Sequence, residues 1–312
     1  MRALAERNYT TSWGDDARSL HGFFRAQARR ESQILRGKLA ARLSPGHPSG
    51  PPIFLVGCPR SGTTLLFDLL RQHPDLVSLP HEGHVYWTAY NHPRRHGWRS
   101  DALEAEDASP AERRYLNTAF SRVGHGRLLD KTPKNVLRLP YLRSLFPDAQ
   151  IVLIVRDGRA TTASLLQGWR HRHGASYFLP EPLRLTDYNG RLWRYVLPPG
   201  WRELQGTELA QVAARQYVAC NSAAVQHQAL VDVVIKYEDI VAQPVEALRK
   251  LTSQLQLPQS EVVLQAAEQS PKNLRGAITA PRQDKWREVA EDLAPYLSEI
   301  EEQMRVWGYA RG

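Results

Sequence analysis

The hydrophobic positions of this chain alternate between short continuous runs and longer stretches with helical spacing. Two runs, Ile53–Gly57 and Gln150–Val155, are apolar at almost every position, as in strands that are buried on both faces of a parallel sheet. Shorter apolar runs at 127–129 and 231–235 predict two more strands. Helical spacing is found in five stretches, at 18–43, 63–72, 160–167, 245–257 and 288–306.

The order of these segments predicts an α/β fold with a P-loop-type parallel β-sheet flanked by helices. The stretch at 18–43 predicts an N-terminal helical extension of one or two helices, and the sequence SPGHPSGPP at 44–52 predicts a linker. We therefore divide the chain into an extension at 1–50 and an α/β domain at 51–312. The amphipathic extension has two interpretations, binding of a membrane or partner and packing on the main domain, and packing is favoured.

An aromatic-rich insertion interrupts the alternation at 168–205. Its Trp and Tyr content is too high for a disordered linker. We interpret it as a lid or an acceptor-binding insertion. A packed structural excursion is the alternative.

Composition and charge narrow the classes of partner. The formal net charge is +9, which suits a nucleotide, a sulfated or phosphorylated substrate, nucleic acid or an acidic surface; a solvated Arg-rich surface is the alternative. The two cysteines, Cys58 and Cys220, are too few for a disulfide framework or a metal cluster. With no signal-peptide pattern and no apolar run long enough to span a membrane, we expect a soluble, cytoplasmic protein.

The most informative motif is GCPRSGTTLL, in which the first predicted strand enters a Gly-rich loop and a leucine-striped helix leaves it. Loop N–H groups and the positive end of the helix dipole form an anion-binding site in such a turn. The register Gly57-x-x-x-x-Gly62-Thr63-Thr64 is almost that of a P-loop, but Thr63 stands where the phosphate-binding Lys is expected. The cation inside the loop is Arg60. We therefore expect a nucleotide with a shorter anionic tail than a triphosphate.

Other polar residues follow strands or lie near the loop. Glu82 is a candidate general base for an acceptor hydroxyl, with His81 and His84 as alternatives, and Lys131 is a candidate for stabilising charge on a leaving oxygen. For each of Glu82 and Lys131 taken alone, a solvated side chain is the default interpretation. The spacing of His81-Glu82-x-His84 differs from that of a zinc-binding helix, so we expect no metal.

A second anion site is predicted where the strand at Gln150–Val155 ends. Arg156 leaves this strand and Ser164 lies two turns into the next helix, a pair that suits a second phosphate. A surface pair between Arg156 and Asp157 is the alternative. Because ligands of parallel sheets bind beyond the carboxyl ends of the strands, Arg60, Lys131, Arg156 and Tyr237 are expected to converge on one cleft.

Together these motifs resemble the sulfotransferases that use 3′-phosphoadenosine 5′-phosphosulfate (PAPS), with the tyrosylprotein sulfotransferases and related bacterial enzymes most similar. PRSGTTLL resembles the 5′-phosphosulfate loop, IVLIVRDGRATTAS the 3′-phosphate motif, VIKYEDIV a nucleotide-contacting segment, and SPKNLRGAITAPRQDKW a C-terminal cofactor loop. The resemblance runs from about residue 53 to residue 286, with the motifs in the family's order.

The resemblance implies roles for individual residues. Catalytic roles fall on Glu82, Lys131, Arg60 and Ser270, and cofactor binding on Arg60, Ser61, Gly62, Thr63, Thr64, Arg156, Ser164, Tyr237 and Lys285. Glu82 lies one residue later than the family's base. Gly168 stands where the family has an Arg, which Arg170 or Arg172 could replace. The N-terminal helices and the aromatic insertion have no matched counterpart.

We therefore expect a PAPS-dependent O-sulfotransferase that needs no metal and releases adenosine 3′,5′-bisphosphate. Its acceptor would be a hydroxyl compound with an aromatic or sugar ring, for which Trp87 and the aromatic insertion are candidate contacts. We expect no nucleic-acid partner and no membrane span, and the sequence leaves a homodimer open. The alternatives are a P-loop kinase or nucleotide hydrolase, and a non-catalytic binder of anionic polymers.

Overall fold

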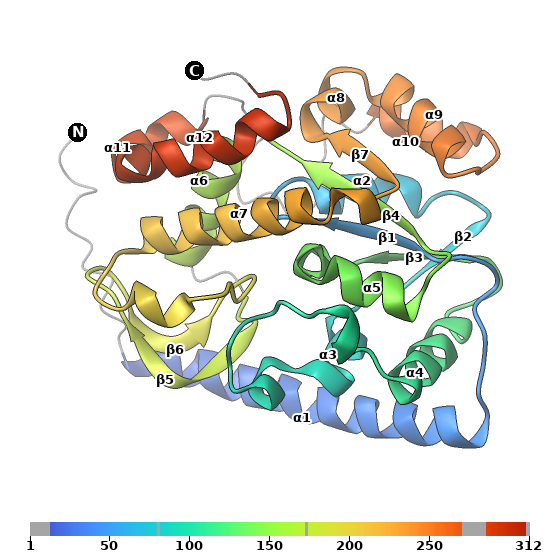
Figure 1. Cartoon of the computed structure of the whole chain (residues 1–312), viewed down its shortest axis with the longest axis horizontal. Coiled ribbons are helices and arrows are strands. Elements are labelled where there is room, and N and C mark those ends of the chain that lie inside the picture. The colour runs from blue at the N-terminus through green and yellow to red at the C-terminus, as the bar shows by residue number, and fades with distance from the viewer. Residues whose placement is uncertain (1–12, 80–81, 172–173, 270–284, 310–312) are drawn as a thin grey trace.

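The computed structural model describes residues 13–79, 82–171, 174–269 and 285–309 (Figure 1). Its centre is a parallel sheet of five strands in the order β2-β3-β1-β4-β7. The strands are β1 (Ile53–Gly57), β2 (Leu76–Ser78), β3 (Arg127–Lys131), β4 (Gln150–Val155) and β7 (Val233–Lys236).

Register places the ends of these strands together. Leu55 of β1 lies opposite Lys131 of β3 on one side and Val152 of β4 on the other. The residues that follow the strands therefore meet at one edge of the sheet, where ligands of parallel sheets bind.

Apolar side chains alternate between the two faces of the sheet and form a core on each. Phe54 and Val56 of β1 belong to the larger core, and Ile53 and Leu55 to the smaller one. The larger core includes residues of α4 (Pro110–Ser121), α5 (Leu139–Leu145), α6 (Gly158–Arg170), α7 (Leu209–Gln226), α11 (Ala290–Leu293) and α12 (Leu297–Val306). The smaller core includes residues of α2 (Thr63–Leu70), α8 (Tyr237–Ala242), α9 (Pro244–Gln254) and α10 (Glu261–Gln269).

The N-terminal extension is one long helix, α1 (Trp13–Leu43), which lies apart from the sheet along one edge of the molecule (Figure 1). It packs against α4 and α3 (His84–Asn91), with Lys38 donating to the Ala89 carbonyl at 2.8 Å. The favoured interpretation of the extension, packing on the main domain, is therefore confirmed. Each helix within the described part of the chain is too short or too polar to cross a lipid bilayer.

The aromatic insertion contains an antiparallel hairpin, β5 (Tyr177–Arg184) and β6 (Asn189–Trp193), that the sequence pattern did not predict. Three tryptophans of the insertion, Trp169, Trp193 and Trp201, are fully buried, and their rings meet edge to face. Much of the insertion is therefore core, while other aromatic residues of it line a cavity described below.

The predicted α/β class is confirmed, with deviations at element ends. The four strands expected from the apolar runs are present, and β2 is an additional short strand. The helix expected over 288–306 is divided into α11 and α12 by a 3₁₀ segment that contains Pro295, since proline lacks the N–H that a continuous helix needs.

Candidate active site

The loop between β1 and α2 is held in one conformation by close packing. Gly62, the residue before α2, has φ 101°, and a Cβ at this position would stand 2.2 Å from a ring carbon of Tyr237. Gly57, the last residue of β1, is also tightly packed, because a Cβ there would stand 2.6 Å from the carbonyl oxygen of Ile154 in β4. Between them, Arg60 has φ 74°. Non-glycine residues rarely adopt this conformation, and those that do are often found at functional sites.

The N-terminus of α2 is open to an anion. The N–H groups of its first turn have no intrahelical acceptor, as in any helix, and no side-chain cap bonds to them. Thr63 is buried and Thr64 is partly exposed at the same end of the helix. Helix dipole and N–H groups together make this the kind of anion site that the sequence predicts.

Arg60 connects this loop to the second predicted anion site. Its Nε donates to Ser164 Oγ of α6 at 3.0 Å, and its carbonyl accepts from Arg156 Nη1 at 3.1 Å. The Arg156 guanidinium also lies 4.3 Å above the Tyr237 ring. Asp157 caps α6 and pairs with Arg159 at 2.7 Å, so the alternative of an Arg156–Asp157 pair is wrong.

Lys131 and Glu82 meet beside the same loop. Lys131 leaves the end of β3, donates to Thr64 Oγ1 at 3.3 Å and forms an ion pair with Glu82 Oε1. The second Glu82 oxygen, Oε2, hydrogen-bonds His84 Nε2. Lys131 is buried, and the Glu82 side chain is 36% exposed.

These contacts set the charge states of the pair. Although burial raises the pKa of Glu82, the His84 and Lys131 contacts outweigh it and hold this pKa well below its usual range. Burial lowers the pKa of His84, with Glu82 acting in the opposite direction. At neutral pH the site therefore contains an ionised carboxylate between a lysine and a histidine.

The segment after Glu82 is fixed to β3. Gly83 N donates to Thr132 Oγ1 at 3.1 Å, and a Cβ on Gly83 would stand 2.5 Å from Asp130 Oδ1. Trp87 is fully buried and donates to Asp130 Oδ2 at 2.8 Å. The expectation that Trp87 contacts an acceptor is therefore wrong, because its ring belongs to the core.

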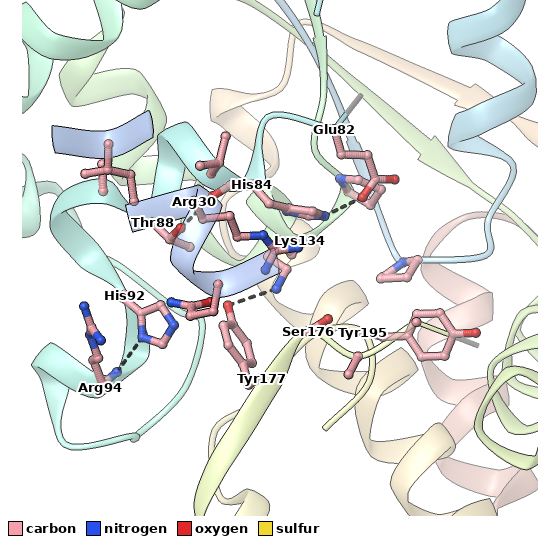
Figure 2. Close-up of a pocket in the computed structure, with 18 of the residues that line it drawn as sticks. Arg30, Glu82, His84, Thr88, His92, Arg94, Lys134, Ser176, Tyr177 and Tyr195 are labelled. Atoms are coloured by element: carbon pink, nitrogen blue, oxygen red, sulfur yellow. Dashed lines mark hydrogen bonds and ion pairs between the residues drawn. The ribbon is translucent and has the colours of Figure 1, made fainter. Parts of the chain in front are cut away.

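A cavity of about 350 Å³ opens beside Glu82 (Figure 2). Lys134 and His92, which the sequence analysis did not select, line it together with Tyr177 and Tyr195 of the aromatic insertion. Lys134 lies three residues after Lys131 in DKTPKN, which is the signal that could have identified it. Residues 27–38 of α1 also contribute, so the helical extension is part of the site.

Tyr195 fills the space beside Gly168, the position where the resembled family has an Arg. A Cβ on Gly168 would stand 1.6 Å from the Tyr195 hydroxyl oxygen. Arg170, one suggested replacement, pairs with Asp292 at 2.9 Å, and Arg172 lies outside the described residues.

Three of the residues expected at the site have no described side chain in the structure. His81 and Ser270 lie outside the described residues, and the Lys285 side chain is likewise outside them. In the described part of the chain, no three His, Cys, Asp or Glu side chains form a group that could hold a metal ion.

Comparisons with known proteins agree with this geometry. A family model described as "Sulfotransferase family" matches residues 51–261. The nodulation protein NoeE of Sinorhizobium fredii is 29% identical over 237 residues, 70% of this chain and 52% of that protein. Protein-tyrosine sulfotransferase A of Caenorhabditis elegans is 28% identical over 228 residues, 69% of this chain and 52% of that protein. The matched region thus spans about half the length of these two relatives.

Solved structures share the fold at low sequence identity. The sulfotransferase domain from the curacin biosynthetic pathway has a TM-score of 0.55 and 15% identity, covering 84% of this chain and 99% of that one. Sulfotransferase STF9 of Mycobacterium avium has a TM-score of 0.54 and 17% identity, covering 88% of this chain and 81% of that one.

Proposed function

Because the chain belongs to the sulfotransferase family, we propose that it moves the sulfuryl group of PAPS to an acceptor hydroxyl by in-line displacement, leaving adenosine 3′,5′-bisphosphate. The observation that carries this proposal is the Arg60 network. One arginine of the phosphate-binding loop contacts Ser164 through its side chain and Arg156 through its carbonyl. A nucleotide with anionic groups at both its 5′ and 3′ ends needs two such sites side by side.

The residues present fit this donor. PAPS supplies a sulfuryl group that is activated by the phosphate to which it is bound. The uncapped N-terminus of α2, with Thr63, Thr64 and Arg60, would hold the 5′ end. Arg156 and Ser164 would hold the 3′-phosphate; within the described residues, Arg156 forms no ion pair that would compete with it.

The chain's own groups would move the proton and stabilise charge. Glu82, ionised at neutral pH, would accept the proton of the acceptor hydroxyl, with His84 holding its second oxygen in place. Lys131 lies between Thr64 of the loop and Glu82, so its ammonium can stabilise negative charge that develops beside the loop. Roles for Ser270, Tyr237 and Lys285 rest on the family resemblance.

Binding measurements separate this proposal from a P-loop kinase. Isothermal titration should detect adenosine 3′,5′-bisphosphate binding without Mg²⁺, while Mg·ATP should bind weakly because Thr63 replaces the P-loop lysine. Sulfonate adducts should form from PAPS and phenols, as followed by mass spectrometry. Tight Mg·ATP binding without bisphosphate binding would overturn the proposal.

Two substitutions test the assigned roles. Glu82→Gln and Lys131→Met should each lower turnover by ~10²–10³-fold, the usual effect of removing one charge-stabilising or proton-accepting group. Affinity for the bisphosphate should stay within about threefold. The exposed residues Glu203 and Lys250 provide matched controls as Glu203→Gln and Lys250→Met. Full activity of Glu82→Gln would transfer the base to His84 or His81.

A further inference from the structure

The cavity beside Glu82 has an excess of positive charge. Besides Arg60, which the proposed function assigns to the donor, its lining includes two carboxylates, Glu31 and Glu82, and five cationic side chains: Arg30, Lys38, Arg94, Arg95 and Lys134. Both carboxylates already have cationic partners, since Glu31 pairs with Arg94 at 2.8 Å and Glu82 pairs with Lys131. The lining therefore attracts anions rather than neutral or cationic molecules.

A buried cluster beneath the cavity adds to this excess. Asp101 is fully buried and pairs with both Arg138, at 2.7 Å, and Lys134, at 3.4 Å. Its remaining side-chain contacts are with the Tyr177 hydroxyl and the Leu197 N–H. Two buried cations therefore share one ion-pair partner, while Glu82 also acts electrostatically on Lys134 and Glu112 on Arg138. Sharing one partner between two buried cations is unfavourable, and an anion placed against Lys134 would relieve this.

Titration of Lys134 is consistent with this imbalance. Burial lowers the pKa of Lys134, and Asp101, shared with Arg138, restores it only in part. Lys134 also donates to the Tyr177 hydroxyl at 2.9 Å, which fixes its ammonium at the wall of the cavity.

Figure 2 shows how the charges are distributed along the cavity. Glu82 lies at one end and Arg94 at the other, while Lys134 and Tyr177 lie between them. The α1 side is formed by Gln27, Arg30 and Ile34, among others. A cavity of about 350 Å³ suits a small molecule rather than a folded partner.

We propose that the acceptor is a small hydroxyl compound that also carries an anionic group, a carboxylate, phosphate or sulfate. Its hydroxyl lies at Glu82, and its anionic group is bound between Lys134 and the arginines Arg30 and Arg95. The helix α1 is thus a specificity-determining wall of the site. This inference rests on the proposed sulfuryl transfer, because Glu82 defines the reactive end.

Three phenols of similar size test the charge preference. They are 4-hydroxyphenylacetate, its neutral amide, and tyramine, which is cationic. With the donor site filled by adenosine 3′,5′-bisphosphate, titration should show the carboxylate binding at least 10-fold tighter than the amide, and tyramine weakest. With PAPS, kcat/KM should follow the same order.

Surface substitutions avoid disturbing the buried cluster. Arg30 and Arg95 are exposed, so the double variant Arg30→Gln/Arg95→Gln should fold normally. It should lose about 10-fold in affinity for the carboxylate and keep that for the amide. Arg29 is exposed on α1 and does not line the cavity, so Arg29→Gln is the matched control and should change neither.

The outcomes distinguish the two proposals. Equal binding of the carboxylate and the amide, or an unchanged preference in the double variant, would overturn the anionic acceptor while leaving sulfuryl transfer intact. Failure of the sulfotransferase proposal would instead appear as absent bisphosphate binding and no transfer to any phenol by the wild-type protein.

Discussion

Gly62 allows the loop between β1 and α2 to contact Tyr237, so adding one methyl group should weaken the proposed nucleotide binding. In Gly62→Ala the new Cβ would stand 2.2 Å from a Tyr237 ring carbon. Carbon atoms in contact are about 3.5–4.0 Å apart, so the ring must move by more than about 1 Å. That movement separates Tyr237 from Arg156, whose guanidinium lies 4.3 Å from the ring centre.

The magnitude follows from these contacts. A cation–π contact contributes about 0.5–2 kcal/mol, and the shifted loop loses part of its anion geometry as well. A total of about 1.4–2.8 kcal/mol corresponds to a 10- to 100-fold weaker affinity for adenosine 3′,5′-bisphosphate. Titration calorimetry without Mg²⁺ measures this directly.

Gly50 supplies the matched control. It has φ 97°, close to the 101° of Gly62, but a Cβ there meets no atom within 4 Å. Gly50→Ala therefore also places a non-glycine residue at a positive φ, which costs about 1–2 kcal/mol, but without the collision. Equal bisphosphate affinities for the two alanine variants would refute the reasoning, because strain alone would then explain any effect.

Three further predictions concern stability. Asp101→Asn leaves two buried cations without their carboxylate and should lower the free energy of unfolding by about 3–5 kcal/mol in urea titrations, whereas the exposed Asp148→Asn should change it little. Burial raises the pKa of the Glu112 carboxyl from 4.5 to about 7. The stability that protonated Glu112 contributes is therefore complete below pH 4.5 and is lost, by about 3 kcal/mol, as the pH rises through 7. The free energy of unfolding should not show this decline in Glu112→Gln. Gly168→Ala should destabilise the fold by about 1–3 kcal/mol, because the new methyl group collides with the Tyr195 hydroxyl. Adding Tyr195→Phe should restore at least half of that loss, as measured by thermal unfolding. If nothing is restored, the contact does not cause the loss.

The local pattern of apolar residues was sufficient to predict the main strands of the sheet. The apolar runs at β1 and β4 are buried on both faces, and such runs have few other stable environments. The glycine-rich turn into α2 was also predicted from the sequence, because the residues that form it are consecutive in the chain. The short strand β2 was missed because its pairing partner β3 lies some fifty residues away in the chain. The β5–β6 hairpin was missed because its strands lack a clear alternation of apolar and polar residues.

The sequence by itself therefore determined four of the five sheet strands, the glycine-rich loop and the family resemblance, and it named Arg60, Lys131, Arg156 and Glu82 as candidates. Only the tertiary structure decided which of them meet. Arg60 and Ser164 are 104 positions apart, and the contact between them depends on the register of β1 and β4.

The cavity that we propose for the acceptor is formed largely by long-range packing. The helix α1 became a cavity wall because it packs on α3 and α4, and Tyr195 occupies the space that Gly168 leaves empty. Charge balance at Lys134 likewise arises from Asp101 and Arg138, which lie more than thirty residues apart in sequence. Such arrangements follow from three-dimensional proximity, which no local pattern of residues encodes.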